Sequence, residues 1–146
     1  MEEVLYEKND SKQESEVTEE MEKLARKNFT LWNEALLSKN PSRVASLYTK
    51  DNTFLPTVSG DFKKGIEGAE NYFTHFLEKD PNGQIVEDVV QTISPDSYLH
   101  SGMYNFEVGP ADNRSMVEAR FTFLWQKSKH GNWKIAHHHS SIRPKN

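Results

Sequence analysis

The sequence contains no cysteine, which excludes a disulfide framework, a thiolate metal site and a cysteine nucleophile. It also shows no nucleophile elbow, no phosphate-binding glycine loop, no dinucleotide fingerprint and no zinc motif. No segment approaches the roughly eighteen apolar residues of a membrane span, and the N-terminus lacks the basic region and the apolar core of a targeting signal. We therefore expect a cytoplasmic protein with no cofactor and no membrane contact.

Charge is unevenly distributed along the chain. Residues 1–22 contain nine acidic residues against Lys8 and Lys12, a net charge of −7. The whole chain carries −4, so the remainder carries +3. The sequence has no basic cluster of the kind that nucleic-acid-binding proteins concentrate on one face. We therefore expect no nucleic-acid partner, and a body that is mildly receptive to small anions.

The length of 146 residues suits a single domain with one core. Residues 1–14 are polar and lack periodicity, which predicts an acidic disordered arm, and residues 15–146 are expected to form the domain. Between Ser15 and Ser38, apolar residues recur at steps of three and four, which predicts one long amphipathic helix. These residues are Val17, Met21, Leu24, Ala25, Phe29, Trp32, Ala35 and Leu36.

Two shorter helices and a short strand are expected next. Asn40 as N-cap and Pro41 at the first helical position predict a second helix. Its apolar face would contain Val44, Leu47 and Tyr48. Residues 53–55 are expected to form a short strand, and a third helix should precede the breaker sequence KDPNG. The inward residues of that third helix are Ala69, Tyr72, Phe73, Phe76 and Leu77.

Four β-rich runs make up the second half of the chain. Their sequences are QIVEDVVQTIS, SYLHSGMYNFEV, SMVEARFTFLWQKS and NWKIAHHHSSI. The short turn sequences between them predict an antiparallel meander of long strands. Helices followed by strands indicate an α+β fold, in which a long N-terminal helix and two shorter helices pack on one face of a curved antiparallel sheet.

Neither face of the last predicted strand is plainly polar. On strict alternation, one face carries Trp133, Ile135, His137 and His139, and the other carries Lys134, Ala136, His138 and Ser140. A sheet with helices on one side and ring-bearing residues on the other commonly buries that second side against another subunit. We therefore expect a homo-oligomer that associates through the sheet, with His137, His139, Trp133 and Ile135 at the interface.

The strand ARFTFLW, the closing run GNWKIAHHHSS and the order of the elements resemble the nuclear transport factor 2-like superfamily. Within it, the sequence is similar to the association (hub) domain of calcium/calmodulin-dependent protein kinase II and its stand-alone bacterial relatives. The likeness covers residues 17–144. It implies a cone-shaped, cystatin-like fold whose sheet wraps the long helix and leaves a pocket open at one end. It also implies assembly through the sheet into dimers and rings.

The resemblance further implies a pocket in which several arginines bind small carboxylates. Ser140 and Asn105 stand here at two of those arginine positions, and Arg120 is the one arginine on a central predicted strand. The expected ligand is a small carboxylate or an aromatic molecule. The candidate ligand-binding residues are Arg120, His138, Tyr48, Tyr72, Tyr104, Asn105, Trp125 and Ser140.

Two functions are compatible with these residues. The first is a non-catalytic oligomerisation module with a small-molecule pocket. The alternative is a small cofactor-independent enzyme, similar to polyketide cyclases or ketosteroid isomerases, that acts on a hydrophobic substrate through one acid/base pair. The candidates for that pair are His138, Tyr48, Tyr104 and Asp51.

The histidine triplet and Arg120 each allow two interpretations. His137 and His139 could chelate a metal, but the pair lacks the third ligand that a stable site requires. We therefore favour packing at an interface and expect no metal. Arg120 needs a partner if it is buried. That partner is either a carboxylate such as Glu118 or an anionic ligand or neighbouring subunit.

Overall fold

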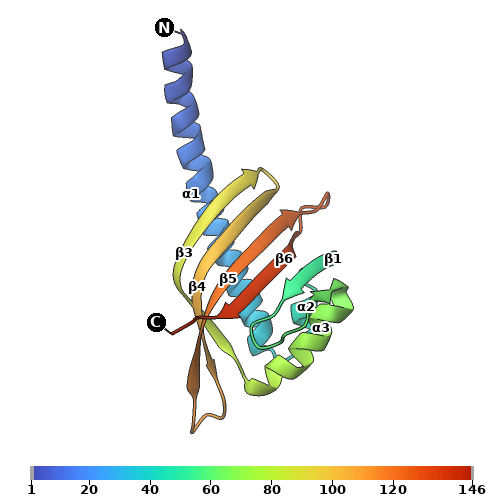
Figure 1. The fold of residues 1–146 in the computed structure, drawn as a ribbon. Coiled ribbons are helices and arrows are strands. Elements are labelled where there is room, and N and C mark those ends of the chain that lie inside the picture. Colours follow the sequence, from blue (N-terminus) through green and yellow to red (C-terminus); the bar gives the residue numbers. More distant parts are fainter. Residues whose placement is uncertain (1, 146) are drawn as a thin grey trace.

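A six-stranded sheet curves around one long helix (Figure 1). The structure is a computed structural model that describes the backbone of residues 2–145 and the side chains of residues 18–145. Its helices are α1 (Glu2–Leu37), α2 (Pro41–Ala45), α3 (Gly65–Phe76) and the short 3-10 helix η1 (Leu77–Lys79). Its strands are β1 (Tyr48–Leu55), β2 (Lys63–Lys64), β3 (Asn82–Ser94), β4 (Ser97–Val108), β5 (Ser115–Lys127) and β6 (Trp133–Ile142).

The strand order is β2-β1-β6-β5-β4-β3. Strands β3 to β6 form the expected antiparallel meander. The α+β class, with a long N-terminal helix and two shorter helices packed on a curved sheet, is confirmed. The sheet is not wholly antiparallel, because β1 pairs with β6 in parallel. Parallel neighbours need a long connection, and here residues 56–132 supply it.

The apolar stripe of α1 packs on the inner face of the sheet. Ala25, Trp32 and Leu36 are each no more than 1% exposed. This spacing places them on one side of the helix, as the sequence predicts. Two polar contacts fix the helix against the strands, because Asn28 Nδ2 donates to the Tyr98 hydroxyl at 2.9 Å and Asn33 Oδ1 accepts from a β3 backbone N–H at 2.7 Å.

The N-terminal part of α1 extends past the end of the sheet (Figure 1). Its backbone is helical from Glu2 onward, and the side chains of residues 1–17 lie outside the described part of the structure. The division into an acidic arm of residues 1–14 and a domain of residues 15–146 therefore stays a prediction.

The second helix begins where the sequence predicts and ends earlier. Asn40 caps it by accepting hydrogen bonds from the backbone N–H groups of Ser42 and Arg43, and Pro41 occupies its first turn. The helix ends at Ala45, so the expectation that Tyr48 lies on its apolar face is wrong. Tyr48 is instead the first residue of β1, with its side chain 2% exposed.

The register of β5 against β6 shifts between Leu124 and Trp125. The shift leaves Ala136 as an extra residue in β6, which is a β-bulge. A bulge reverses the alternation of side chains on either side of it. Ile135 and His138 therefore both face inward, and Ile135 is 0% exposed.

The strict alternation expected for the last strand is thus wrong before the bulge. Ile135 lies in the core, and Trp133 packs against Tyr98 with ring centroids 5.2 Å apart. His137 and His139 lie beyond the bulge, paired with outward-facing residues of β5. Of the four residues predicted for the interface, only these two histidines lie on the open side of the sheet.

Candidate functional site

His138 lies at the centre of the molecule between two aromatic rings. The ring of Phe54 from β1 stacks on one side, with centroids 4.7 Å apart and planes at 9°. The ring of Phe123 from β5 stacks on the other side, at 4.1 Å and 23°. His138 is only 2% exposed. The bulge before it aims the imidazole inward, so the middle histidine of the triplet belongs to the core.

A chain of hydrogen bonds, which we call the His138 relay, runs from α1 through this ring to β6. Trp32 Nε1 donates to the Tyr48 hydroxyl at 3.2 Å. The Tyr48 oxygen lies 2.8 Å from His138 Nδ1, and the Tyr104 oxygen lies 3.1 Å from Nε2. The Tyr104 hydroxyl donates in turn to Ser140 Oγ at 2.5 Å. The relay therefore joins four elements of the fold through one imidazole.

The direction of these bonds assigns the tautomer of His138. An indole N–H can only donate, so the Tyr48 hydroxyl accepts from Trp32 and gives its own hydrogen to Nδ1. Tyr104 gives its hydrogen to Ser140 and therefore accepts the N–H of Nε2. We assign the neutral imidazole with hydrogen on Nε2, because this tautomer satisfies every bond in the relay.

The groups of the relay are held uncharged at neutral pH. Burial lowers the pKa of His138 well below its ordinary value, and the neighbouring His137 and His139 lower it further. Burial also raises the pKa of Tyr48 and of Tyr104. None of the three side chains is more than 2% exposed, so a substrate cannot reach them in this conformation. The arrangement holds the core together and presents no accessible acid or base.

Four of the eight predicted ligand-binding residues meet in the relay. They are Tyr48, Tyr104, His138 and Ser140. The sequence pattern did not single out Trp32 and Thr57, which join the relay at its two ends. Thr57 contacts Ser140 through their hydroxyl groups. An indole at helical spacing looks like an ordinary core residue, and only the folded chain places its N–H beside Tyr48.

Three other predicted residues lie away from the relay. Arg120 and Asn105 are on the opposite face of the sheet, where Arg120 Nε donates to Ser141 Oγ at 3.3 Å. Arg120 is exposed, and among the described side chains it forms no ion pair with Glu118. Trp125 faces inward and stacks on a tyrosine ring of β4, 2% exposed. The structure therefore does not assemble a cavity around Arg120 and His138.

Asp51, a candidate for an acid/base pair, also lies away from the relay. Its side chain is exposed on β1, where Oδ1 accepts a hydrogen bond from Thr49 Oγ1 at 3.0 Å. Its neighbour Asn52 is buried and uses its amide group to bond the backbone oxygen of Thr49 at 2.8 Å. No carboxylate among the described residues thus accompanies His138 as an acid/base partner.

The eighth predicted residue, Tyr72, lines a pocket of about 350 Å³ between α3 and the loop of residues 56–62. Burial raises the pKa of Tyr72 to about 12. Its hydroxyl lies beside Thr57 and Val58 without a well-formed hydrogen bond to either. The pocket also contains Lys63, whose Nζ donates to an asparagine of α3 at 2.9 Å, and Lys79. It therefore combines an aromatic wall with two cations.

A second buried polar cluster, which sequence reasoning missed, ties α1 to β3 and β4. His100 is 0% exposed, and its Nε2 lies 2.8 Å from Asp88 Oδ2. Arg26 donates from α1 to both carboxylate oxygens, at 3.2 and 3.3 Å. Burial acts to raise the pKa of Asp88, but the bonds from Arg26 and His100 outweigh it and leave the pKa below its ordinary value. Burial lowers the pKa of His100.

No helix of the described residues 2–145 packs on the face of the sheet opposite α1, which we call the outer face (Figure 1). Three cross-strand rows run over it from β4 through β5 to β6. They are Leu99–Leu124–His137, Ser101–Thr122–His139 and Met103–Arg120–Ser141. His137 is partly buried, and its Nδ1 lies 2.7 Å from Thr53 Oγ1 of β1. Among the described residues, no three histidine or acidic side chains converge as a metal site requires.

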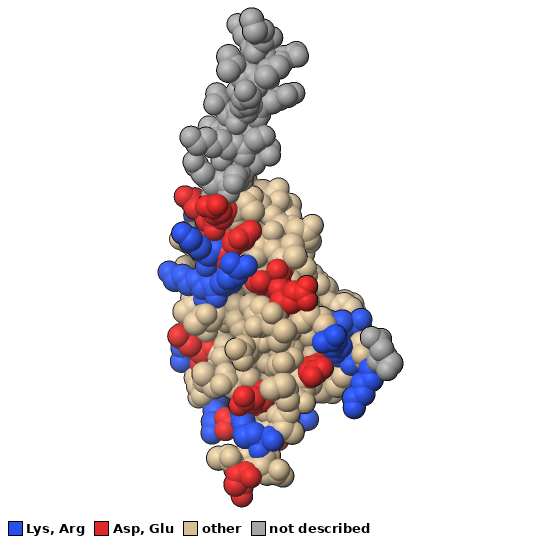
Figure 2. Space-filling model, turned by 90° about the vertical axis from the view of Figure 1, so that its left-hand side faces the viewer, with Lys and Arg blue, Asp and Glu red and all other residues tan. Residues whose placement is uncertain are grey.

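The face shown in Figure 2 carries basic and acidic side chains next to one another in mixed groups. Within the described part of the chain, no helix is both long and apolar enough to cross a bilayer.

Comparison with known proteins assigns the family. Residues 16–144 match the model of the calcium/calmodulin dependent protein kinase II association domain. A crystal structure from Xanthomonas campestris that is assigned to this domain is 40% identical, covering 84% of this chain and 87% of that chain with a TM-score of 0.80. No match was found among curated protein sequences.

More distant solved structures share the fold. A nuclear transport factor 2-like superfamily protein from Salmonella enterica is 17% identical, with a TM-score of 0.70 over 90% of this chain and 94% of that chain. A protein with a cystatin-like fold from Novosphingobium aromaticivorans is 11% identical, with a TM-score of 0.69 over 84% of this chain and 81% of that chain. The cystatin-like, nuclear transport factor 2-like fold expected from the sequence is confirmed. The chain belongs to the calcium/calmodulin-dependent protein kinase II association domain family.

Proposed function

We propose that this protein is a non-catalytic association module that forms a homo-oligomer through the outer face of its sheet. The observation that supports the proposal is the uncovered outer face. Its central rows place Leu99 and Leu124 beside His137, and all three side chains are only partly buried within one chain. A face of this composition is usually covered in the assembled protein. The membership of the association domain family agrees with this proposal.

A second subunit fits this face better than an unrelated partner. A twofold interface brings the same patch of both subunits together, so it must be complementary to itself. The outer face meets that condition, since apolar leucines occupy one row while Arg120 and Glu118 supply opposite charges near another. Neither of these charges forms an ion pair within the described chain. His137 and His139 would lie inside this contact.

Leu124→Glu is expected to convert the oligomer into a monomer. The change places a charge in the middle of the contact, where it would be desolvated without a partner. Sedimentation velocity at micromolar concentration measures the mass. Leu31→Glu is the matched control, because Leu31 is an exposed leucine of α1 and is 43% exposed. A monomeric wild-type protein, or a Leu124→Glu variant with unchanged mass, contradicts the proposal.

The pocket beside Tyr72 supports the binding of a small aromatic carboxylate as part of the same function. Lys63 and Lys79 supply positive charge, and the rings of Tyr72 and Phe76 supply an apolar wall. Asp61, which lies 3.5 Å from Lys63, already balances part of that charge. The affinity should therefore be modest.

Benzoate is expected to bind this pocket, and Lys63→Met should weaken binding severalfold. The lysine loses its charge while its length and apolar stem are kept. Isothermal titration calorimetry measures the affinity. Lys64→Met is the control, because Lys64 is the adjacent, exposed lysine and packs over Phe62 outside the pocket. Equal effects of the two substitutions, or no binding by the wild type, count against the pocket.

A further inference from the structure

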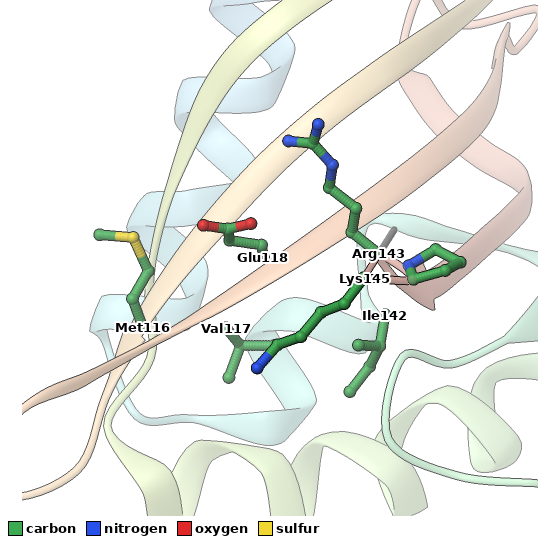
Figure 3. Close-up of a pocket in the computed structure, with 7 residues that line it drawn as sticks. Met116, Val117, Glu118, Ile142, Arg143 and Lys145 are labelled. Atoms are coloured by element: carbon green, nitrogen blue, oxygen red, sulfur yellow. The ribbon is translucent and has the colours of Figure 1, made fainter.

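A groove of about 660 Å³ lies between the start of β5 and the residues that follow β6 (Figure 3). Its walls include Met116 and Ile142, which are 55% and 53% exposed, and Val117 between them. Arg143 and Lys145 extend from the C-terminal residues in different directions (Figure 3). The groove is distinct from the Tyr72 pocket and from the His138 relay, because it shares no residue with either.

The groove combines exposed apolar side chains with uncompensated positive charge. Among the described side chains, no acid lies within 4.0 Å of the charged groups of Arg143 or Lys145. Glu118 is the one acid that lines the groove. A partner with a short apolar run flanked by several acids and one base would therefore match both the walls and the charges. Exposed apolar patches edged by charge commonly mark protein contacts.

The chain itself contains a segment of this composition. Residues 2–8 read EEVLYEK, in which three acids flank the run Val-Leu-Tyr and a lysine follows. This is the only run of three apolar residues in the acidic stretch of residues 1–22. Its lysine provides an opposite charge for Glu118. The acidic N-terminal stretch and the remainder of the chain, at −7 and +3, attract one another overall.

The segment cannot reach the groove of its own chain while α1 is helical. Residues 2–8 begin α1, whose N-terminal end projects beyond the sheet, away from the C-terminus (Figure 1). The helix is 36 residues long, so this end lies well outside the domain body. We infer that the segment of residues 2–8 binds in the C-terminal groove of a second copy of this chain. The inference rests on the proposed self-association and adds a second contact to it.

Site-directed disulfide formation tests this contact in the full chain, because the protein has no cysteine of its own. Leu5→Cys and Met116→Cys proteins are mixed in equal amounts and oxidised gently. The expected result is a mixed disulfide dimer, identified by mass spectrometry of the linked peptides. Val58→Cys in place of Met116→Cys is the control, since Val58 is a comparably exposed apolar residue, 42% exposed, outside the groove.

Reversing the charges on each side tests whether electrostatic attraction holds residues 2–8 in the groove. Reversing Arg143 and Lys145 to glutamate in the Met116→Cys protein is expected to reduce the yield of mixed disulfide severalfold, more at low than at high salt. Replacing the three acids of residues 2–8 with lysine in the Leu5→Cys protein should restore the yield with the reversed groove. If neither charge reversal alters the yield of mixed disulfide, the inference is overturned.

Two other outcomes also overturn it. In a chain carrying both Leu5→Cys and Met116→Cys, a disulfide within one chain at high dilution would show that the segment binds its own groove. A mixed yield no higher than that of the Val58→Cys control would show that the segment binds elsewhere. If sedimentation still reports an oligomer that Leu124→Glu dissociates, the outer-face proposal stands although this contact fails.

Discussion

Replacing Asp88 with alanine is expected to lower the free energy of unfolding by about 3 kcal/mol. Among the described side chains, Asp88 Oδ2 is the one hydrogen-bond partner of the His100 ring, whose Nδ1 is already buried without a hydrogen bond. Without the carboxylate, both ring nitrogens would be unsatisfied in a side chain that is 0% exposed. Arg26 contributes less to the loss, since its side chain is 53% exposed and can turn to water. Urea denaturation measures the change.

Two further variants separate this effect from a general loss of charge. Glu22→Ala removes the other carboxylate beside Arg26, at 3.9 Å, and leaves His100 paired. Glu22→Ala should lower the free energy of unfolding by less than about 0.5 kcal/mol. The double variant Asp88→Ala with His100→Leu is expected to be more stable than Asp88→Ala alone, because no unsatisfied ring nitrogen remains. If Asp88→Ala lowers the free energy of unfolding no more than Glu22→Ala does, the buried Asp88–His100 pair does not stabilise the fold. The same conclusion follows if the double variant is no more stable than Asp88→Ala alone.

Acidification is expected to destabilise the protein as the pH falls below about 6.5, the ordinary histidine value. Burial lowers the pKa of His138 and that of His100, so the unfolded chain takes up protons before the folded one does. Their contribution is complete above the unfolded pKa and is lost as the pH falls toward the lowered folded pKa. For each such histidine, the free energy of unfolding can fall by up to about 1.4 kcal/mol per pH unit. A protonated Nδ1 of His138 would also oppose the hydrogen of Tyr48.

The slope of the free energy of unfolding against pH, compared between variants, separates the contribution of His138 from those of the other titrating groups. His138→Gln should reduce the dependence of the free energy of unfolding on pH between neutrality and about pH 5, whatever its effect on stability at neutral pH. His130→Gln is the control, because His130 is exposed in the turn between β5 and β6. Denaturation at a fixed protein concentration keeps any contribution from self-association constant. Equal slopes for wild type and His138→Gln would mean that the buried relay does not resist protonation.

The regular strands show how much of the fold can be predicted from local pattern. In β5 the alternation predicts one apolar face made of Val117, Ala119, Phe121, Phe123 and Trp125. The last four are at most 3% exposed, and Val117 at the start of the strand is partly buried. The same reasoning places Asn40 as the cap of α2. These predictions hold because a strand repeats every two residues and a cap acts on its own first turn. Sequence pattern is therefore sufficient to predict features that depend only on neighbouring residues.

The candidate site was predicted only in part, for two physical reasons. The bulge at Ala136 inserts one residue and reverses the alternation on one side of it, and the sequence around it contains no glycine or proline to mark it. Arg120 and Asn105 were grouped with His138 by residue type, although the pleat of β4 and β5 places them on the opposite face. Grouping by chemistry fails when strand register decides which side chains meet.

The sequence by itself determined the α+β class, the long helix, the four-strand meander and the family, because these depend on periodicity and on short motifs. The tertiary structure alone decided which polar groups are joined. Trp32 and Tyr48 are 16 residues apart, Tyr48 and His138 are 90 apart, and Arg26 and Asp88 are 62 apart, yet each pair is hydrogen-bonded. Such pairs form because burial favours hydrogen bonding between whichever polar groups the fold brings within reach. No local sequence pattern predicts which of these distant residues become hydrogen-bonded to one another.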